Sequence, residues 1–314
     1  MNTRWGTPVC SPLLSSMYSL VLAALEIDAK SNSTFKIEEL PRASPPPGMS
    51  ISTIPTGVIE SRAALAFSGG SYSDLRHFAL CAVLVRHPSG DLLFDTGIGK
   101  NWQTHFSALP WLMRKATKVK PGIPAAQQLL AHGYSPSNLA GIVLTHSHWD
   151  HISGVEDFSS VPVWMTNEEI SFVDSGHRST AVARSIGTFP KKPYLFADGP
   201  YLGFSSSHDV WADGSVVLVP APGHTPGSVI AFIALPSGHR IALIGDIVWQ
   251  MEGVGREVPK PWLSRMIADY SPGDVQRLIH ALAHLQATRP EIKMIPSHDE
   301  RAMNLLPIWP KSLS

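Results

Sequence analysis

Four residues of metal-ligand type lie within a six-residue stretch near the middle of the chain. They are His146, His148, Asp150 and His151, in the spacing H-x-H-x-D-H. Imidazole and carboxylate groups together suit Zn²⁺ or another first-row divalent cation. The preceding run, residues 141–145, is apolar and β-branched, which predicts a buried strand. The four side chains are therefore expected just past the carboxyl end of a strand, where α/β proteins usually place their chemistry.

Three later positions repeat one pattern, in which an apolar run leads into a residue of ligand type. They are His224 in a turn rich in Pro and Gly, Asp246, and His298. Any one of them alone is more often a turn residue than a ligand. Together with the cluster they make seven nitrogen or oxygen ligands, which is the number that two zinc ions sharing one carboxylate require. The density of ligands predicts two metal ions rather than one.

The composition excludes several other classes of protein. With 44% hydrophobic and 16% charged residues, the 314-residue chain has a globular composition. Lys plus Arg equals Asp plus Glu at 25 each, so the broad basic surface needed for binding nucleic acid is not expected. The two cysteines, Cys10 and Cys81, are far from the cluster in sequence, and no CxxC motif occurs. We therefore expect neither a disulfide framework nor a thiolate metal site.

The first fifty residues differ from the rest. Leu13 to Leu25 is apolar but too short to span a bilayer, and it has the length of a signal-peptide core. Only Arg4 supplies positive charge before it and no convincing cleavage site follows, which favours a cytoplasmic location over export. Residues 1–50 are expected to be a leader or extension that ends in the Pro-rich linker at 43–48. A folded domain is predicted for residues 51–314.

Apolar periodicity gives the expected elements. Strands are predicted over residues 78–85, 92–94, 141–145, 161–166, 216–219, 229–235, 240–244 and 292–296. Helices are predicted over residues 124–132, 167–173 with Asn167 as its cap, and 271–286. Strands come in two sets, each followed by helices and each with an acidic residue at a strand end, Asp95 or Asp246. This arrangement suggests two similar halves.

Three further features allow more than one interpretation. Residues 98–121 carry several large apolar side chains and form either helix packed on the core or a flap over the site. Residues 174–213 have no strong periodicity, and a loop of that length is usually functional or poorly ordered. His280 and His284 have metal-ligand spacing on the last helix, but they point away from its apolar stripe, so both are expected to be solvated.

With these landmarks in place, the chain resembles the metallo-β-lactamase superfamily. The matching residues are Asp95-Thr-Gly97, the H-x-H-x-D-H motif at 146–151, Gly223-His-Thr-Pro-Gly227, Gly245-Asp246 and His298, which span roughly residues 75–300. The resemblance implies an α/β fold of the αββα sandwich type, with the site at one edge of two packed sheets. It also implies that residues 51–314 form one hydrolase domain.

The resemblance implies a division of the ligands between two ions. One would be held by His146, His148 and His224, and the other by Asp150, His151 and His298, with Asp246 bridging both. Two divalent cations, Zn²⁺ being expected, would lower the pKa of a bridging water so that hydroxide attacks a carbonyl carbon. Asp150 would be both a ligand and a catalytic proton shuttle to the leaving oxygen. Asp95 is a candidate acceptor for a ligand histidine, besides supporting its loop.

Within the superfamily, the chain looks most like the quorum-quenching N-acyl-homoserine lactonases. It has the bridging Asp that true β-lactamases lack, a lactonase-like spacing between His224 and Asp246, and no added nucleic-acid module. Those lactonases usually carry a tyrosine three residues after the bridging Asp, where this chain has Trp249, whose indole N–H can only donate. Trp249 is predicted to bind the substrate, either as that donor or as part of an acyl pocket. Alternatively, Tyr194, Tyr201 or Tyr270 reaches in, or the substrate differs.

These observations lead to one expected function and two alternatives. We expect a metal-dependent hydrolase that opens a lactone or ester resembling an N-acyl-homoserine lactone. The first alternative is a thioesterase, organophosphate hydrolase or phosphodiesterase on the same site, and the second is a non-catalytic metal protein or redox relative. Few Lys or Arg lie near the motifs, whereas apolar residues at 102–113, Trp249 and Met251 favour a small-molecule substrate with an acyl or apolar part. Neither nucleic acid nor a membrane span is expected, and a homodimer is left open.

Overall fold

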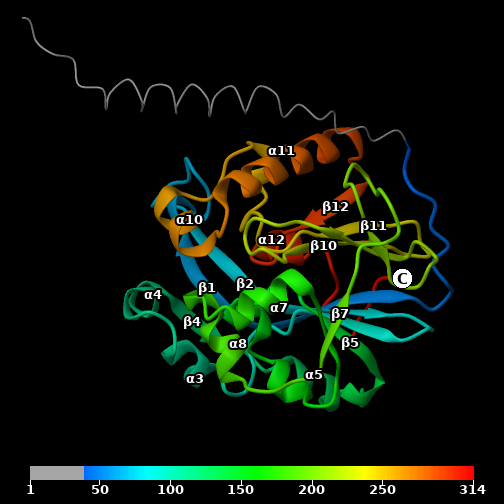
Figure 1. Cartoon of the computed structure of the whole chain (residues 1–314), viewed down its shortest axis with the longest axis horizontal. Helices are drawn as coiled ribbons and strands as arrows, with labels where there is room; N and C mark the ends of the chain where they lie inside the picture. Colours follow the sequence, from blue (N-terminus) through cyan, green and yellow to red (C-terminus); the bar gives the residue numbers. More distant parts are fainter. Residues whose placement is uncertain (1–38) are drawn as a thin grey trace, which may run out of the picture. The chain divides into compact units, whose positions relative to one another are not determined.

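Two stacked β-sheets with helices on both outer sides form the protein (Figure 1). The structure is a computed structural model, and it describes residues 39–314. The expected αββα sandwich is therefore confirmed. Most of the predicted leader lies outside the described residues, and its Pro-rich end at 43–48 runs without helix or strand into the first strand. Within residues 39–314, the helices are all too short or too polar to cross a membrane.

The first sheet has seven strands in the order β4-β1-β2-β3-β5-β6-β7. The first four strands in this order, β4, β1, β2 and β3, are paired antiparallel. The pairing is parallel from β3 through β5 and β6 to β7. The strands are β1 (Ser50–Arg62), β2 (Leu75–Arg86), β3 (Asp91–Phe94), β4 (Lys118–Pro121), β5 (Leu139–Val143), β6 (Val163–Thr166) and β7 (Lys191–Tyr194).

The second sheet has five strands in the order β12-β11-β10-β9-β8. Its pairs are antiparallel except for β11 and β12, which run parallel. The strands are β8 (His208–Asp209), β9 (Val216–Pro220), β10 (Val229–Ala234), β11 (Arg240–Leu243) and β12 (Ile292–Ile295). Each sheet is thus built from a continuous part of the chain, as expected for two halves, although the first is larger.

Helices cover the outer side of each sheet (Figure 1). Those that follow strands of the first sheet are α2 (Ala63–Ala66), α3 (Trp102–Ser107), α4 (Trp111–Ala116), α5 (Ala125–Ala131), α6 (Trp149–Ile152), α7 (Asn167–Asp174) and α8 (Ala181–Ser185). Those of the second half are α9 (Glu252–Gly255), α10 (Trp262–Ala268) and α11 (Pro272–Thr288). The short helix α12 (Glu300–Met303) instead contributes Ala302 and Met303 to the core between the sheets. Short 3₁₀ turns occupy Pro136–Asn138, Val155–Phe158 and Arg178–Thr180.

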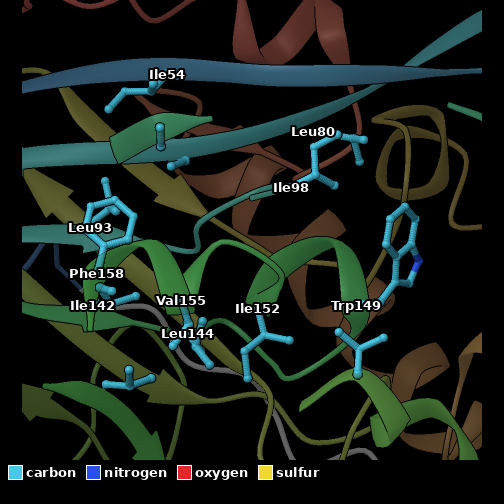
Figure 2. Close-up of a cluster of buried hydrophobic side chains, with 14 of the residues drawn as sticks. Ile54, Leu80, Leu93, Ile98, Ile142, Leu144, Trp149, Ile152, Val155 and Phe158 are labelled. Atoms are coloured by element: carbon cyan, nitrogen blue, oxygen red, sulfur yellow. The ribbon is translucent and has the colours of Figure 1, made fainter. Parts of the chain in front are cut away.

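Strand alternation explains why the sheets stack. Along β2, Leu80 and Leu84 belong to the core on the helix side, and Val83 and Val85 belong to the core between the sheets. Successive side chains of a strand point to opposite faces, so a strand that is apolar at every position is buried on both. Figure 2 shows part of the helix-side core, where strand residues meet residues of α6 and the turn after it. These two cores hold the strand ends in place.

Several expected elements need correction. The strand β1 was not predicted, because Pro55, Gly57 and polar residues interrupt its apolar pattern; the pairing with β2 shifts register between those two residues. Thr166, not Asn167, caps α7: its Oγ1 accepts from the Glu169 amide at 3.1 Å. Residues 174–213, expected to be a long loop, contain α8, β7 and β8.

Two alternatives are also decided by the fold. Trp102, Phe106 and Met113 pack against the helix-side core from α3 and α4, so most of this segment is packed helix, while Trp111 is 67% exposed. His280 and His284 are exposed on α11, as predicted, and the helix buries its apolar stripe of Val275, Ile279, Leu282 and Leu285.

Candidate metal centre

All seven predicted ligands follow the carboxyl ends of strands. The cluster at 146–151 follows β5 and runs into α6, His224 follows β9, Asp246 follows β11, and His298 follows β12. The first of these strands is in one sheet and the other three are in the second sheet. Because the sheets stack with these ends at a common edge, side chains far apart in sequence meet there.

Ligand atoms of the seven side chains lie within 4.8 Å of one another in three overlapping groups. The groups are His146, His148 and His224; His146, His151 and Asp246; and Asp150, His151 and His298. Two of them have the membership that the resemblance implies for the two ions. The structure thus brings together every predicted ligand; that the site holds two ions remains a prediction.

Asp246 lies between the two halves of the cluster. Its Oδ2 is 3.6 Å from His224 Nε2 and 3.1 Å from His298 Nε2, and its Oδ1 is 3.5 Å from His151 Nε2. Asp150 completes the second group, with Oδ2 3.3 Å from His298 Nε2. A carboxylate in this position can serve both ions.

Three ligand histidines are oriented by partners on their other ring nitrogen. Nδ1 of His151 is 2.8 Å from Asp95 Oδ2, Nδ1 of His224 is 2.8 Å from Asp269 Oδ1, and Nδ1 of His298 is 2.8 Å from the Ala79 carbonyl oxygen. Each partner accepts a hydrogen, which assigns the proton to Nδ1 and leaves the Nε2 lone pair for a metal.

Asp95 has the dual role expected from the sequence. Besides accepting from His151, its carboxylate accepts from the backbone N–H of Thr145 at 2.7 Å and the Thr145 hydroxyl at 2.8 Å. Its φ of 53° is in the left-handed region, which a residue other than Gly rarely adopts. The hydrogen bonds to Thr145 hold this conformation, so Asp95 joins the end of β3 to the loop that carries the ligand cluster.

Glu169 was not predicted to take part, because with the cap expected at Asn167 it was an ordinary residue in the first turn of a helix. Its side chain is instead 1% exposed and accepts from the Ser147 amide at 2.7 Å, the Thr225 hydroxyl at 2.6 Å and the Gly227 amide at 3.0 Å. One carboxylate therefore connects the loop of His146 and His148 to the loop of His224.

A buried ion pair behind His224 was also missed. Lys260 is 1% exposed, and its Nζ donates to Asp269 Oδ1 at 2.7 Å and to the Ile247 carbonyl at 3.2 Å. The same Asp269 oxygen accepts from His224. Burial raises the pKa of Asp269, but Lys260 and His224 outweigh it and leave that pKa below the usual value. Asp269 is therefore a charged acceptor that orients a predicted ligand.

The electrostatics of the site suit divalent cations. Burial and neighbouring histidines hold the pKa values of His146 and His148 well below the usual range, so both imidazoles are neutral, as a metal ligand must be. Burial lowers the pKa of His151, yet Asp95 and Asp246 raise it further, to well above its usual value. Asp95 and Asp246 thus favour a positive charge beside them. A proton on His151 provides this charge in the metal-free protein, and a bound metal ion would provide it instead.

Among the seven predicted ligands, two buried atoms have no hydrogen-bond partner within the described residues, His151 Nε2 and Asp246 Oδ1. In addition, Nε2 of His146 and Nε2 of His224 lie 3.1 Å apart, although both carry lone pairs when their Nδ1 atoms are protonated. Buried polar atoms normally have partners. Unpaired acceptor atoms that point toward one another are what a metal site without its ion presents. The residues at this site therefore fit the predicted metal ions.

Trp249 lies at the site. Its Nε1 donates to Asp246 Oδ2 at 2.9 Å, and its half-buried ring packs beside Phe78. Of the alternative tyrosines, Tyr194 lies in the core between the sheets and Tyr201 packs on Phe232. Tyr270 is exposed, and its amide donates to the carbonyl oxygen of the ligand His224. Tyr270 is thus the only one of the three tyrosines with a contact to a predicted ligand.

The fold and the ligand arrangement define a class of metal-dependent hydrolase. The sequence model of the metallo-beta-lactamase superfamily matches residues 81–298, a range that contains all seven predicted ligands. The chain belongs to this superfamily.

Similar proteins include metallo-hydrolases and a lactonase. The chain is 35% identical over 148 residues to the probable metallo-hydrolase Rv2300c of Mycobacterium tuberculosis, covering 45% of this chain and 47% of that protein. It is 22% identical over 175 residues to the N-acyl homoserine lactonase AttM of Agrobacterium fabrum, covering 54% and 65%. A third relative is the metallo-hydrolase mfmC of Annulohypoxylon moriforme, 24% identical over 49% of this chain and 44% of that protein. The chain spans about half the length of such curated relatives.

Solved structures share the fold over a larger part of the chain. A mutant of B. thuringiensis AiiA with N-decanoyl-L-homoserine bound has a TM-score of 0.68 and 21% identity, covering 84% of this chain and 98% of that one. The dizinc quorum-quenching lactonase AidC, in complex with a product, has a TM-score of 0.57 and 15% identity, covering 87% and 92%. At these identities the likeness establishes the fold.

Proposed function

We propose that residues 51–314 form a dinuclear-metal-dependent hydrolase that opens a lactone or ester, with N-acyl-homoserine lactones as the substrate class. One observation carries the proposal. Seven histidine and aspartate side chains from four strand ends converge, and their ring-nitrogen and carboxylate ligand atoms lie within 4.8 Å of one another in each of three groups. The resemblance of these motifs to the lactonases, and the names of AttM and AiiA among similar proteins, support the choice of substrate.

The proposed ions are Zn²⁺, which the donor set of five imidazoles and two carboxylates suits. When bound, two such cations lower the pKa of water and polarise a carbonyl oxygen. His146, His148 and His224 would hold one ion, and Asp150, His151 and His298 the other. Asp246, whose carboxylate lies among His151, His224 and His298, would serve both ions.

The side chains of the protein have separate tasks in ester opening. Asp95, Asp269 and the Ala79 carbonyl accept from ligand histidines and keep their Nε2 atoms turned inward. Asp150 is half-buried, and its Oδ1 lies 4.0 Å from His151 Nε2, beyond hydrogen-bond distance. We assign to this Oδ1 the transfer of a proton to the leaving oxygen as the C–O bond breaks.

Apolar residues support a substrate with an acyl part. Trp249 is half-buried beside the bridging carboxylate, and α3 packs on α6 through the contact of Phe106 with Trp149, at 5.6 Å between ring centroids. Trp149 stands between the ligands His148 and Asp150 in the sequence. Because the N–H of Trp249 is already bonded to Asp246, its proposed contact with the substrate would come from the ring.

The substrate class is tested with the metal-loaded protein and a panel of lactones, esters, thioesters and phosphotriesters. We expect kcat/KM to be highest for acyl-homoserine lactones and to depend on acyl length. The proposal fails if a thioester or phosphotriester is turned over faster than every lactone, and the enzyme would then be assigned to that class.

Metal content provides the first prediction. The purified protein should bind close to two transition-metal ions per chain, measured by inductively coupled plasma mass spectrometry, because the seven ligands divide into two groups around Asp246. Exhaustive chelation should abolish hydrolysis, and added Zn²⁺ should restore it. Full activity in protein shown to be free of metal would contradict the proposed site.

A further inference from the structure

The indole N–H of Trp249 points at the carboxylate that lies between the two groups of ligands. Nε1 donates to Asp246 Oδ2 over 2.9 Å. The other close atoms around this carboxylate are Nε2 atoms of His151, His224 and His298, at 3.1 to 3.6 Å. Those histidine nitrogens would present lone pairs to a bound metal ion, so they would not donate to Asp246 in the loaded centre. The indole N–H of Trp249 cannot be lost in this way, and it is therefore a permanent donor to Asp246.

The two oxygens of Asp246 consequently have different surroundings. Oδ2 accepts from Trp249, whereas Oδ1 is buried and has no hydrogen-bond partner within residues 39–314. A terminal carboxylate otherwise rotates over a broad range about its last torsion. With one oxygen fixed by a donor, the plane of the carboxylate is fixed as well, and Oδ1 stays directed toward His151.

The indole ring is itself held in place. It packs beside Phe78 with 5.5 Å between ring centroids, and the buried ammonium of Lys260 lies 5.5 Å from its centroid. The next residue, Gln250, donates from Nε2 to the His298 carbonyl oxygen at 2.8 Å. Contacts on the ring and on the following residue therefore keep the donor aimed at Asp246.

We propose that Trp249 is a positioning residue, which sets the orientation of the shared Asp246 carboxylate and thereby the affinity of the centre for its metal ions. Trp249 acts through Asp246 and does not need to touch the substrate. This inference rests on the proposed dinuclear site and assigns a role to the residue that stands where the lactonases carry tyrosine. Loss of a partner that orients a metal ligand typically lowers metal affinity about 10–100-fold.

The test compares Trp249→Phe with Trp211→Phe in the full chain. Both substitutions keep an aromatic ring and remove an indole N–H. Trp211 stacks on His87, and its Nε1 has no hydrogen-bond partner in the described part of the chain, so its replacement removes no bond seen there. Affinities for Zn²⁺ and Co²⁺ alone are measured by competition with a chromophoric chelator. We expect binding at least about tenfold weaker in Trp249→Phe and unchanged in Trp211→Phe, with similar melting temperatures for the two metal-free proteins.

Each other outcome contradicts the inference in a recognisable way. Equal affinities of the two variants would overturn it. A lower kcat on lactones with unchanged metal affinity would also overturn it, and would assign the N–H to the substrate instead. The titration needs no substrate, so a failed lactone assay does not affect it. If the unmodified chain itself binds neither ion, the proposed function fails together with this inference.

Discussion

Replacing Asp246 by alanine should remove metal and activity together. Both oxygens of this side chain face Nε2 atoms of predicted ligands from the two groups, so one substitution damages both sites. We expect kcat/KM on the best substrate of the panel to fall more than about a hundredfold, beyond the 10–100-fold typical for a residue that only orients a ligand. Bound metal, measured on the same preparation, should fall to well below two ions per chain.

His284→Ala is the matched control for this substitution. His284 has metal-ligand spacing from His280, yet it lies exposed on α11, and neither residue belongs to a group of candidate ligands. Metal content and kcat should be unchanged. A loss of metal on replacing His284, or full metal content after replacing Asp246, would show that the ligands are assigned incorrectly.

Replacing Lys260 by methionine should lower the free energy of unfolding of the metal-free protein by about 3–5 kcal/mol, the usual effect of removing one partner of a buried ion pair. The substitution keeps an unbranched side chain, one atom shorter, but removes the ammonium and leaves the Asp269 carboxylate buried with His224 as its remaining side-chain partner. Oδ2 of Asp269 already has no hydrogen bond in the part of the chain that the structure describes. Denaturant unfolding followed by circular dichroism measures the difference.

Lys191→Met makes the same chemical change at an exposed ion pair. Lys191 Nζ lies 3.0 Å from Asp174 Oδ1, and both side chains are accessible to solvent. Surface pairs of this kind contribute about 0.2–1 kcal/mol, so Lys191→Met should unfold close to the unmodified protein. If the two variants lost similar amounts of unfolding free energy, the buried pair of Lys260 and Asp269 would stabilise the protein no more than a surface pair does.

The sequence carried most of the information about strands and ligands. Strands that are apolar on both faces are recognisable as short continuous runs, as in β9, β10 and β11, because both of their faces must be buried. Each predicted ligand follows such a run directly. The order of strand and ligand is therefore visible without knowing which strands are neighbours. β1 shows the limit, because Pro55, Gly57 and its polar residues hide a strand of thirteen residues.

The orientation of the ligands depends on contacts that the sequence does not reveal. Glu169 reads as an ordinary residue in the first turn of a helix, yet it accepts from Thr225, which is 56 residues away. Lys260 and Asp269 flank α10 and read as ordinary surface charges until the fold buries them. In each case the partner is brought close by strand order and sheet stacking, which no local pattern encodes.

Trp249 shows how the two kinds of information divide. Its type and its place three residues after Asp246 were determined by the sequence, and they marked the position as a departure from the lactonases that the chain resembles. Only the tertiary structure decided where its N–H points, because Phe78 from β2 and Lys260 before α10 fix the ring against Asp246. The identity of a ligand is a local chemical property, whereas its orientation is the result of packing between distant segments.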